Sequence, residues 1–504
     1  MANPLYDALF APLAGQERPF LILPDGSAVS ADGFHRMIAR FGNALRAMGL
    51  AAGERIAVQA SKTPQMLACY GAAVATGAVF LPLNPAYTAD ELEYFVTDCG
   101  ARLLLVDPDR VAALTPLAER LGLRLESLGP GGSFDALADA GPDSLTPEPR
   151  GPEDLAALLY TSGTTGRSKG AMMSHRNLLS NARTLVDLWR FTEADVLLHA
   201  LPIFHTHGLF VASNVVLLSG GQMIFLPKFD IEQVFALLPR ATAMMGVPTF
   251  YTRLLDDPRL GRGTVGHMRL FVSGSAPLLA ETHHAWAERT GHAILERYGM
   301  TETNMLTSNP CDGARRAGTV GLALPDVDLR IVDPETGAEL APGETGMIEV
   351  RGPNVFQGYW QMPEKTAAEF RPDGYFITGD LGVIDDQGYV TIVGRAKDLI
   401  ISGGYNVYPK EVELVLDEMP GVLESAVIGL PHPDLGEAVV AVLAAAGAGP
   451  DPGAIRAALS ERLARYKQPR EYVVLPELPR NAMGKVQKAE LRKTHADLFR
   501  RTAR

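Results

Sequence analysis

A loop rich in glycine, serine and threonine, TSGTTGRSKG at residues 161–170, is the part of the sequence best suited to chemistry. It follows the apolar run Leu155 to Tyr160, which predicts a buried strand. Glycines let backbone amides approach a ligand, hydroxyls add donors, and Lys169 supplies a positive charge. This combination predicts a phosphate-binding loop, and its place directly behind a buried strand disfavours a plain surface loop.

The patterns of several other catalytic sites are missing from the sequence. The glycines of the loop do not fit G-x-x-x-x-G-K-[ST], and no G-x-G-x-x-G occurs. His205 and His207 stand one residue apart without an H-E-x-x-H, which argues against a zinc hydrolase. Ser273 and Ser275 lie in no G-x-S-x-G, so the serine hydrolase elbow is absent as well.

The loop needs a scaffold, and the surrounding sequence predicts helices that alternate with short apolar strands. The strand-like runs are Arg102 to Val106, Leu155 to Tyr160, Met223 to Leu226 and Leu270 to Ser273. From about Val327 onward the runs become β-rich and are separated by turns, as in Gly346 to Val350 and Tyr389 to Val393. The first part therefore predicts an α/β fold, and the second predicts a further sheet or a small barrel.

The C-terminal residues predict a small α+β unit with its own core. A short strand leads to the turn Gly403-Gly404, and a helix opens at Pro409, where a missing amide proton costs nothing. A further helix carries an apolar stripe from Ile455 to Leu463. The residues 129–152, rich in glycine and proline, are predicted to form a surface loop rather than a domain boundary.

Composition excludes several classes of protein. With 47% hydrophobic and 21% charged residues, the 504-residue chain is globular, and ~150 residues per domain gives about three folding units. A net charge of −12 makes the surface a poor match for nucleic acid. Three cysteines without a C-x-x-C pair and termini without a targeting signal predict a cytoplasmic protein. The apolar stretches Leu67 to Leu83 and Leu209 to Leu226 each predict a buried helix followed by a buried strand, not a membrane span.

Five motifs follow one another along the chain: the loop at 161–170, YGMTE at 298–302, TGD at 378–380, GRAKD at 394–398 and PRNAMGK at 479–485. Together they resemble the adenylate-forming acyl-CoA synthetase superfamily, and the resemblance covers essentially the whole chain. Within that superfamily, three runs are similar to those of malonyl-CoA synthetases. They are FHTHG at 204–208, GVPTFYTR at 246–253 and ERYGMTETNM at 296–305.

The resemblance implies an α/β fold with a large ATP- and acyl-binding domain over residues 1–394, made of parallel α/β sheets and a β-rich subdomain. A hinge at 395–397 and a small mobile α+β domain over 398–504 complete it. Two half-reactions are implied: a carboxylate displaces pyrophosphate from ATP, and the thiol of coenzyme A then displaces AMP from the acyl adenylate. Malonate is the expected acid, with methylmalonate second.

Most motif residues are assigned to ATP by the resemblance. Glu302 is expected to bind Mg²⁺, with Thr301 at the α-phosphate, Tyr298 stacked on adenine and Asp380 at the ribose hydroxyls. In isolation such side chains are more often solvated or part of a core, so these roles depend on the resemblance. The full set expected at ATP is Thr161, Ser162, Gly163, Thr164, Thr165, Gly166, Lys169, Gly274, Ser275, Ala276, Glu296, Arg297, Tyr298, Gly299, Met300, Thr301, Asp380 and Arg395.

Other positions belong to the domain movement that the resemblance implies. Lys485 is expected to pair with the carboxylate and the α-phosphate, and only during adenylation, because it lies far along the chain from the phosphate loop. Lys397 is the expected hinge. The Gly403-Gly404 turn is expected beside the coenzyme A arm in the second step. A lysine acyltransferase that acylated Lys485 would remove its charge and block adenylation.

The acid is expected to bind among the malonyl-CoA synthetase-like runs. A second carboxylate in a dry pocket needs a cation, because an unpaired buried charge costs several kcal/mol. Arg253 is the expected cation and His207 the second donor, with Thr206 and Met305 at the pocket wall. From spacing alone, a helix-capping role for Arg253 is equally compatible.

Three alternative functions stay open at this point. One is a ligase for short- or medium-chain monocarboxylates, and another is an adenylation enzyme that loads a carrier protein. The third is an adenylate sensor without catalysis, which the presence of both Glu302 and Lys485 disfavours.

Overall fold

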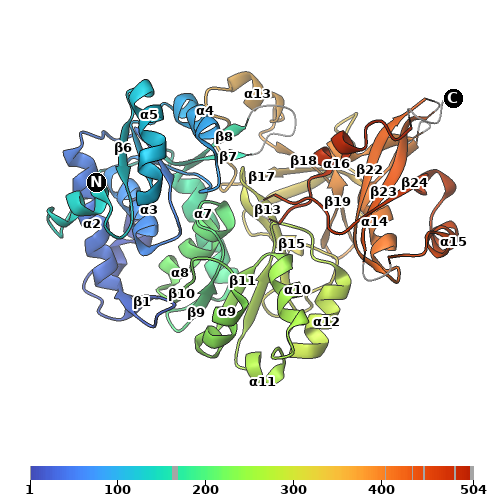
Figure 1. The fold of residues 1–504 in the computed structure, drawn as a ribbon, viewed down its shortest axis with the longest axis horizontal. Helices are drawn as coiled ribbons and strands as arrows, with labels where there is room; N and C mark the ends of the chain where they lie inside the picture. Colours follow the sequence, from blue (N-terminus) through green and yellow to red (C-terminus); the bar gives the residue numbers. More distant parts are fainter. Residues whose placement is uncertain are drawn as a thin grey trace. The chain divides into compact units, whose positions relative to one another are not determined.

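The computed structural model describes residues 2–161, 168–402, 405–433, 435–445, 449–481 and 484–499, which group into two compact units (Figure 1). The first unit comprises Met1–Asp328 and Arg351–Gly374, and the second comprises Leu329–Val350 and Tyr375–Arg504. Most of the β-rich residues that follow Asp328 therefore belong to the same compact unit as the C-terminal part of the chain. The domain boundary expected at 394–398 stays a prediction.

The first unit contains two sheets, as expected for an α/β fold. The larger has the strand order β15-β14-β13-β12-β11-β9-β10-β1-β2, in which the inner strands are parallel and β2, β14 and β15 are antiparallel. The smaller has the order β6-β5-β3-β4-β7-β8, and only β8 is antiparallel to its neighbour. The strands are β1 (Pro19–Ile22), β2 (Ala28–Ser30), β3 (Arg55–Gln59), β4 (Val79–Pro82), β5 (Leu103–Val106), β6 (Arg124–Ser127), β7 (Leu155–Thr161), β8 (Lys169–Ser174), β9 (Val196–His199), β10 (Gln222–Phe225), β11 (Ala243–Gly246), β12 (Leu270–Ser273), β13 (Leu295–Met300), β14 (Asn304–Ser308) and β15 (Leu322–Ala323).

Helices pack around these sheets (Figure 1). They are α1 (Pro4–Leu9), α2 (Ala31–Ala47), α3 (Pro64–Thr76), α4 (Ala89–Cys99), α5 (Val111–Leu121), α6 (Ser133–Asp139), α7 (His175–Trp189), α8 (Asn214–Ser219), α9 (Ile231–Leu237), α10 (Pro248–Asp256), α11 (Arg262–Val265), α12 (Ala280–Thr290) and α13 (Pro363–Ala368), and a π-helical turn, His207–Ser213, leads into α8. The two apolar stretches are a buried helix and strand each, α3 with β4 and α8 with β10, as predicted. The expectation of a plain loop at 129–152 is wrong in part, because α6 forms there and packs Phe134 and Ala138 into the core.

The second unit contains the sheets β16-β17-β18-β19 and β21-β20-β23-β22, with β24 added to β23. Its strands are β16 (Asp328–Val332), β17 (Gly346–Arg351), β18 (Phe376–Ile384), β19 (Val390–Arg395), β20 (Ile400–Ser402), β21 (Tyr405–Val407), β22 (Val422–His432), β23 (Gly436–Ala445) and β24 (Glu471–Leu475). Its helices are α14 (Pro409–Asp417), α15 (Pro452–Arg462) and α16 (Lys488–Thr494).

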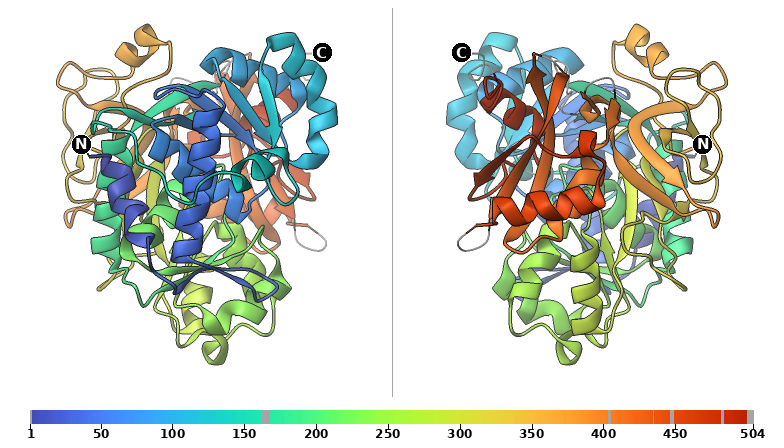
Figure 2. Two further views of the ribbon diagram at one scale, coloured as in Figure 1. Left: turned by 90° about the vertical axis from the view of Figure 1, so that its left-hand side faces the viewer. Right: turned by 90° about the vertical axis from the view of Figure 1, so that its right-hand side faces the viewer.

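Alternating side chains of β22 and β23 supply two cores on opposite faces of the C-terminal sheet. In Figure 2 the strands of this sheet and its helices are drawn in orange and red. Val427 and Val439 pack with residues of α14 and α15 on one face. Ile428 and Val440 pack with Leu491 of α16 on the other. The predicted α+β unit with its own core is thus present. Within the described residues, no helix is long and apolar enough to cross a membrane.

Candidate functional site

The predicted phosphate loop connects the antiparallel strands β7 and β8, which pair from Leu155 with Ser174 to Thr161 with Lys169. The Lys169 ammonium lies 3.1 Å from Glu369 Oε1 and 4.0 Å from the ring centroid of Tyr359. The predicted phosphate cation is therefore held by an acid and an aromatic ring. The rest of the loop lies outside the described residues: Ser162, Gly163, Thr164, Thr165 and Gly166.

The expected metal ligand Glu302 belongs to the same cluster. Its residue is 6% exposed, and its Oε1 lies 3.0 Å from the hydroxyl of Tyr359. That hydroxyl also lies 2.6 Å from Glu369 Oε2. Burial and the charges of the two carboxylates raise the pKa of Tyr359, so the phenol keeps its proton. Thr301 is half-buried beside Glu302.

Tyr359 and Glu369 were not anticipated, because neither lies in a motif. Tyr359 lies in the segment Arg351–Gly374, which belongs to the first unit, and forms an antiparallel β-bridge with Ala171 of β8. Glu369 is the C-cap residue that directly follows the short helix α13. Only the aromatic pair Tyr359-Trp360 could have drawn attention to this segment.

The residues expected around adenine follow two adjacent parallel strands. Gly274, Ser275 and Ala276 come directly after β12, and Tyr298, Gly299 and Met300 end β13, its partner in the sheet. The carboxyl ends of parallel strands are where α/β folds bind ligands. Tyr298 and Met300 are half-buried, while Glu296 is buried and accepts a hydrogen bond from the Leu278 amide at 3.1 Å. A Cβ on Gly299 would lie 1.9 Å from the carbonyl oxygen of Asn304, so only glycine fits there.

Arg297, expected at ATP, is the buried cation of this region. It is 3% exposed, and its Nε and Nη2 are buried without a hydrogen-bond partner in the described part of the chain. Its guanidinium packs against Gly274, where an added Cβ would lie 2.5 Å from Cζ. Burial lowers the pKa of Arg297 to about 9, which leaves the group charged at neutral pH.

Two histidines share the electrostatic environment of Arg297. Burial, and then the charge of Arg297, lower the pKa of His205 to about 4. The same causes hold the pKa of His207 well below its ordinary value. Both imidazoles are therefore neutral at pH 7, and Arg297 is the positive charge among these three side chains.

Two strained residues hold the predicted acyl-binding side chains. Ser275 has φ 72° and its Oγ lies 3.1 Å from His207 Nδ1, and Asn304 has φ 51° and its Oδ1 accepts a hydrogen bond from Thr206 at 2.8 Å. Left-handed φ values in residues other than glycine are uncommon and cluster at functional sites. Met305 is fully buried next to Asn304. Thr206, His207 and Met305 thus lie in one region with Arg297, and Asn304 joins it without having been anticipated.

The expected role of Arg253 at the second carboxylate stays a prediction. Helix α10 buries Tyr251 and Leu254, and Arg253 is on an exposed face. The described residues give it no hydrogen bond and no ion pair. An amphipathic helix packs its apolar side on the core. Arg253 is two positions after the buried Tyr251, so it points to the opposite side of α10.

In the second unit, strands β18 and β19 bring Asp380 opposite Arg395. Arg395 Nε and Asp380 Oδ1 lie 2.6 Å apart, and the Asp380 side chain is 5% exposed. The expected ribose ligand is therefore already paired with the second expected nucleotide contact. Any ribose hydroxyl would share Asp380 with this guanidinium.

Lys485 and Lys397 face the same charges in that unit. Lys485 is exposed as a residue, and desolvation followed by the charge of Arg395 lowers the pKa of its ammonium, against the effect of Asp380 and Asp398. Desolvation, Arg395 and Lys485 lower the pKa of Lys397 to about 8. The turn that carries Lys485 is closed by its amide, which donates to Asn481 Oδ1 at 3.0 Å. The expected coenzyme A turn, Gly403 and Gly404, lies outside the described residues.

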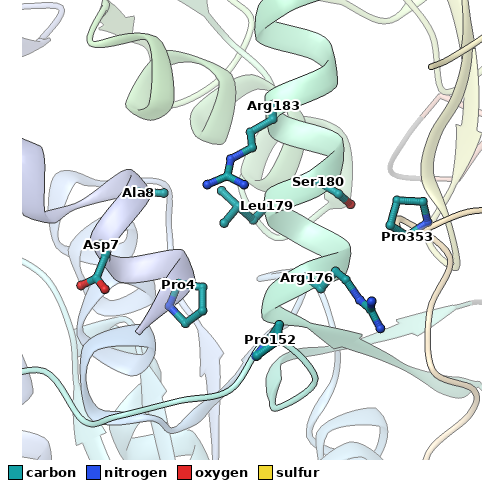
Figure 3. Close-up of a pocket in the computed structure, with 9 residues that line it drawn as sticks. All are labelled: Pro4, Asp7, Ala8, Pro152, Arg176, Leu179, Ser180, Arg183 and Pro353. Atoms are coloured by element: carbon teal, nitrogen blue, oxygen red, sulfur yellow. The ribbon is translucent and has the colours of Figure 1, made fainter. Parts of the chain in front are cut away.

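A surface pocket elsewhere in the first unit holds none of the predicted residues (Figure 3). It lies between α1 and α7, and its lining residues are Pro4, Asp7, Ala8, Pro152, Arg176, Leu179, Ser180, Arg183 and Pro353. No group of three or more His, Cys, Asp or Glu side chains in the described chain could hold a metal by itself. The candidate functional regions are the clusters around Glu302 and Arg297 in the first unit and the cluster around Asp380 in the second.

Comparison with known proteins gives the class. The family model of the AMP-binding enzyme matches residues 13–360, and that of the AMP-binding enzyme C-terminal domain matches residues 411–485. The ATP-bound crystal structure of MatB from Rhodopseudomonas palustris is 55% identical, with a TM-score of 0.97 over 99% of this chain and 100% of that one. Together with the parallel sheets and the small C-terminal domain, these matches define an AMP-forming acid–thiol ligase.

The chain belongs to the AMP-binding enzyme family, and ATP and coenzyme A are its co-substrates. Two relatives with the same sequence identity to this chain are named for different acids. The malonate–CoA ligase of Arabidopsis thaliana is 37% identical over 88% of this chain and 78% of its own. The indoleacetate–CoA ligase of Aromatoleum aromaticum is 37% identical over 90% of this chain and 91% of its own.

Proposed function

We propose that this enzyme is a malonyl-CoA synthetase, which converts malonate, ATP and coenzyme A to malonyl-CoA, AMP and pyrophosphate, with methylmalonate as second acid. The observation that carries the proposal is Arg297. A buried guanidinium with two unsatisfied nitrogens beside neutral histidines costs stability unless an anion meets it. One carboxylate of a dicarboxylic acid supplies that anion, in the two-pronged geometry that Arg favours.

The rest of the acyl site sets the size of the acid. Met305 is fully buried, and Thr206 and His207 are fixed by Asn304 and Ser275. With the long side chain of Arg297 in the same region, the room left suits a short acid. An aromatic acid such as indoleacetate would leave the Arg297 charge unpaired in an apolar contact, which is costly.

The ATP site is proposed at the Lys169, Glu302 and Asp380 clusters. Lys169 and the loop amides hold the β- and γ-phosphates, and Asp380 accepts from the ribose hydroxyls. The buried carboxylate of Glu302 fits the hard oxygen ligand that Mg²⁺ requires. When bound, Mg²⁺ neutralises phosphate charge as the α-phosphorus is attacked. Lys485 orients the attacking carboxylate against the α-phosphate and leaves before coenzyme A attacks.

A panel of acids tests the proposed specificity. We expect the kcat/KM for malonate to exceed that for methylmalonate, and both to exceed those for acetate, butyrate, octanoate and indoleacetate. Pyrophosphate release with acid alone, followed by thioester formation with coenzyme A or with a purified carrier protein, separates the ligase from a carrier-loading enzyme. A preference for butyrate or indoleacetate over malonate would assign the enzyme to monocarboxylates instead.

Proline at the hinge tests the proposed domain movement. Lys397 lies in a short turn, Ala396–Asp398, between β19 and β20. Because proline fixes φ where the backbone must swing, Lys397→Pro is expected to slow one half-reaction by at least about tenfold and to spare the other. Single-turnover rates of adenylation and of thioester formation measure this. Lys397→Ala, which keeps the backbone free, is the matched control, and equal wild-type rates for the proline variant would move the hinge elsewhere.

A further inference from the structure

One hydroxyl in the first unit connects the proposed phosphate cation to the proposed metal ligand. The hydroxyl of Tyr359 lies 2.6 Å from Glu369 Oε2 and 3.0 Å from Glu302 Oε1. Glu369 Oε1 in turn lies 3.1 Å from Lys169 Nζ and 2.7 Å from Lys365 Nζ. The chain of contacts from Lys169 through Glu369 and Tyr359 to Glu302 is unbroken.

A phenol has one proton, so Tyr359 can donate to only one of the two carboxylates at a time. Which carboxylate receives it depends on how strongly each attracts a donor. The contact with Glu369 is the shorter of the two, although Lys169 and Lys365 already neutralise part of the charge of that carboxylate. When a cation leaves Glu369, the carboxylate becomes the stronger acceptor, since hydrogen bonds to uncompensated charge are stronger.

The position of Tyr359 is fixed by the backbone on both sides. The Tyr359 amide donates to Thr366 Oγ1 at 2.9 Å, and the next amide, of Trp360, donates to the carbonyl oxygen of Gly170 at 2.7 Å. Gly170 directly follows Lys169 in β8. The hydroxyl is thus held at a constant place between the carboxylates, and a shift of its proton requires no movement of the ring.

We propose that Tyr359 and Glu369 are positioning residues that couple the binding of triphosphate to the binding of Mg²⁺. In the nucleotide-free enzyme, Glu369 holds Lys169, and both carboxylates lie within hydrogen-bond distance of the Tyr359 hydroxyl, so its proton is shared between them. Triphosphate draws Lys169 away, Tyr359 then donates to Glu369 alone, and Glu302 Oε1 is left with a lone pair for the metal. The coupling rests on the proposed roles of Lys169 and Glu302 in binding MgATP.

Titration calorimetry of ATP with and without Mg²⁺, in the absence of acid and coenzyme A, tests the coupling. Glu369→Gln removes the partner of Lys169 and a charged acceptor of Tyr359. We expect metal-free ATP to bind about fivefold more tightly, because no ion pair has to break. The enhancement of ATP binding by Mg²⁺ should fall about tenfold, because Tyr359 then donates to Glu302. That hydrogen bond to a charged group must break before the metal can use the same oxygen.

Tyr359→Phe keeps the ring over Lys169 and removes the proton. In this background Glu369→Gln should still tighten metal-free ATP but should no longer lower the Mg²⁺ enhancement. Lys365→Met should act in the opposite direction and weaken metal-free ATP, because Glu369 then holds Lys169 more strongly. Tyr6→Phe, which removes a hydroxyl 3.0 Å from His35 Nε2 far from these residues in the sequence, is the matched control and should change neither quantity.

The outcomes separate the coupling from the proposed function. If the wild-type enzyme binds ATP with a Mg²⁺ enhancement but Glu369→Gln lowers that enhancement equally with and without Tyr359, the coupling is wrong and the function stands. If the wild-type enzyme shows no Mg²⁺ enhancement, the proposed metal site is wrong as well. Circular dichroism melts check that each variant is folded, and Lys365→Met, at an exposed side chain, tests the ion-pair step even if the Tyr359 variants unfold.

Discussion

Replacing Lys485 by alanine is expected to slow adenylation by on the order of 10²–10³-fold, the effect of removing one group that stabilises transition-state charge. Thioester formation from supplied malonyl adenylate should stay near the wild-type rate, because the second half-reaction is proposed to proceed with Lys485 withdrawn. Pyrophosphate release and malonyl-CoA formation, each measured in a single turnover, give the two rates. Acylation of Lys485 should reproduce the variant, since it also removes the charge.

The environment of Lys485 adds a pH signature and a control. Because desolvation and Arg395 lower its pKa, adenylation should decline with rising pH earlier than an ordinary lysine would require. Lys488, three positions on, forms an ion pair with Glu413 at 2.5 Å. Lys488→Ala should therefore cost stability without separating the half-reactions. A uniform loss of both half-reactions in a folded Lys485→Ala enzyme would exclude the proposed division of labour.

The elements of the fold could be predicted where burial leaves a clear pattern. Strand β5 is a run of four buried residues, and α14 begins at Pro409. Helix α6 was missed, because its surrounding glycines and prolines outweigh the short apolar pattern around Phe134. Pattern analysis weighs local residues, whereas the burial of Phe134 against Phe41 of α2, at 5.0 Å between centroids, is a tertiary contact.

The site was predictable in its motifs but not in the side chains that orient them. Tyr359, Glu369 and Asn304 act through contacts with residues far away in the sequence, and no local spacing reports such contacts. The resemblance in sequence places Arg297 at ATP and does not identify it as a cation for the acid. Arg253 lies on a helix with a solvent face, whereas Arg297 lies in the β13 strand beside β12. Strands of parallel sheets are buried on both faces, so a charged residue there must meet a partner inside the protein.

Arg297→Met is expected to reduce kcat/KM for malonate by about 2–5 kcal/mol, the range for truncating one partner of a buried charge pair, and to leave butyrate nearly unchanged. The same variant should raise the Tm of the ligand-free enzyme. The substitution removes the buried charge of Arg297, whose Nε and Nη2 have no hydrogen-bond partner among the described residues. Replacing such a charge by an apolar side chain of similar size is often stabilising. Initial rates with the two acids and thermal melts without ligand measure both effects.

Two opposite signs, a loss of malonate activity and a gain of stability, separate a binding role for Arg297 from a structural one. A guanidinium that merely supports the fold would lower the Tm when removed and would cost malonate and butyrate equally. Malonate should likewise raise the Tm of the wild-type enzyme but not that of Arg297→Met, because ligand binding to the native state stabilises it. Arg253→Ala is the matched control: at an exposed helix position it should change either acid by no more than about 0.5 kcal/mol. A selective loss of activity with malonate in Arg253→Ala would instead mean that the Arg253 side chain turns toward the acid and binds its second carboxylate.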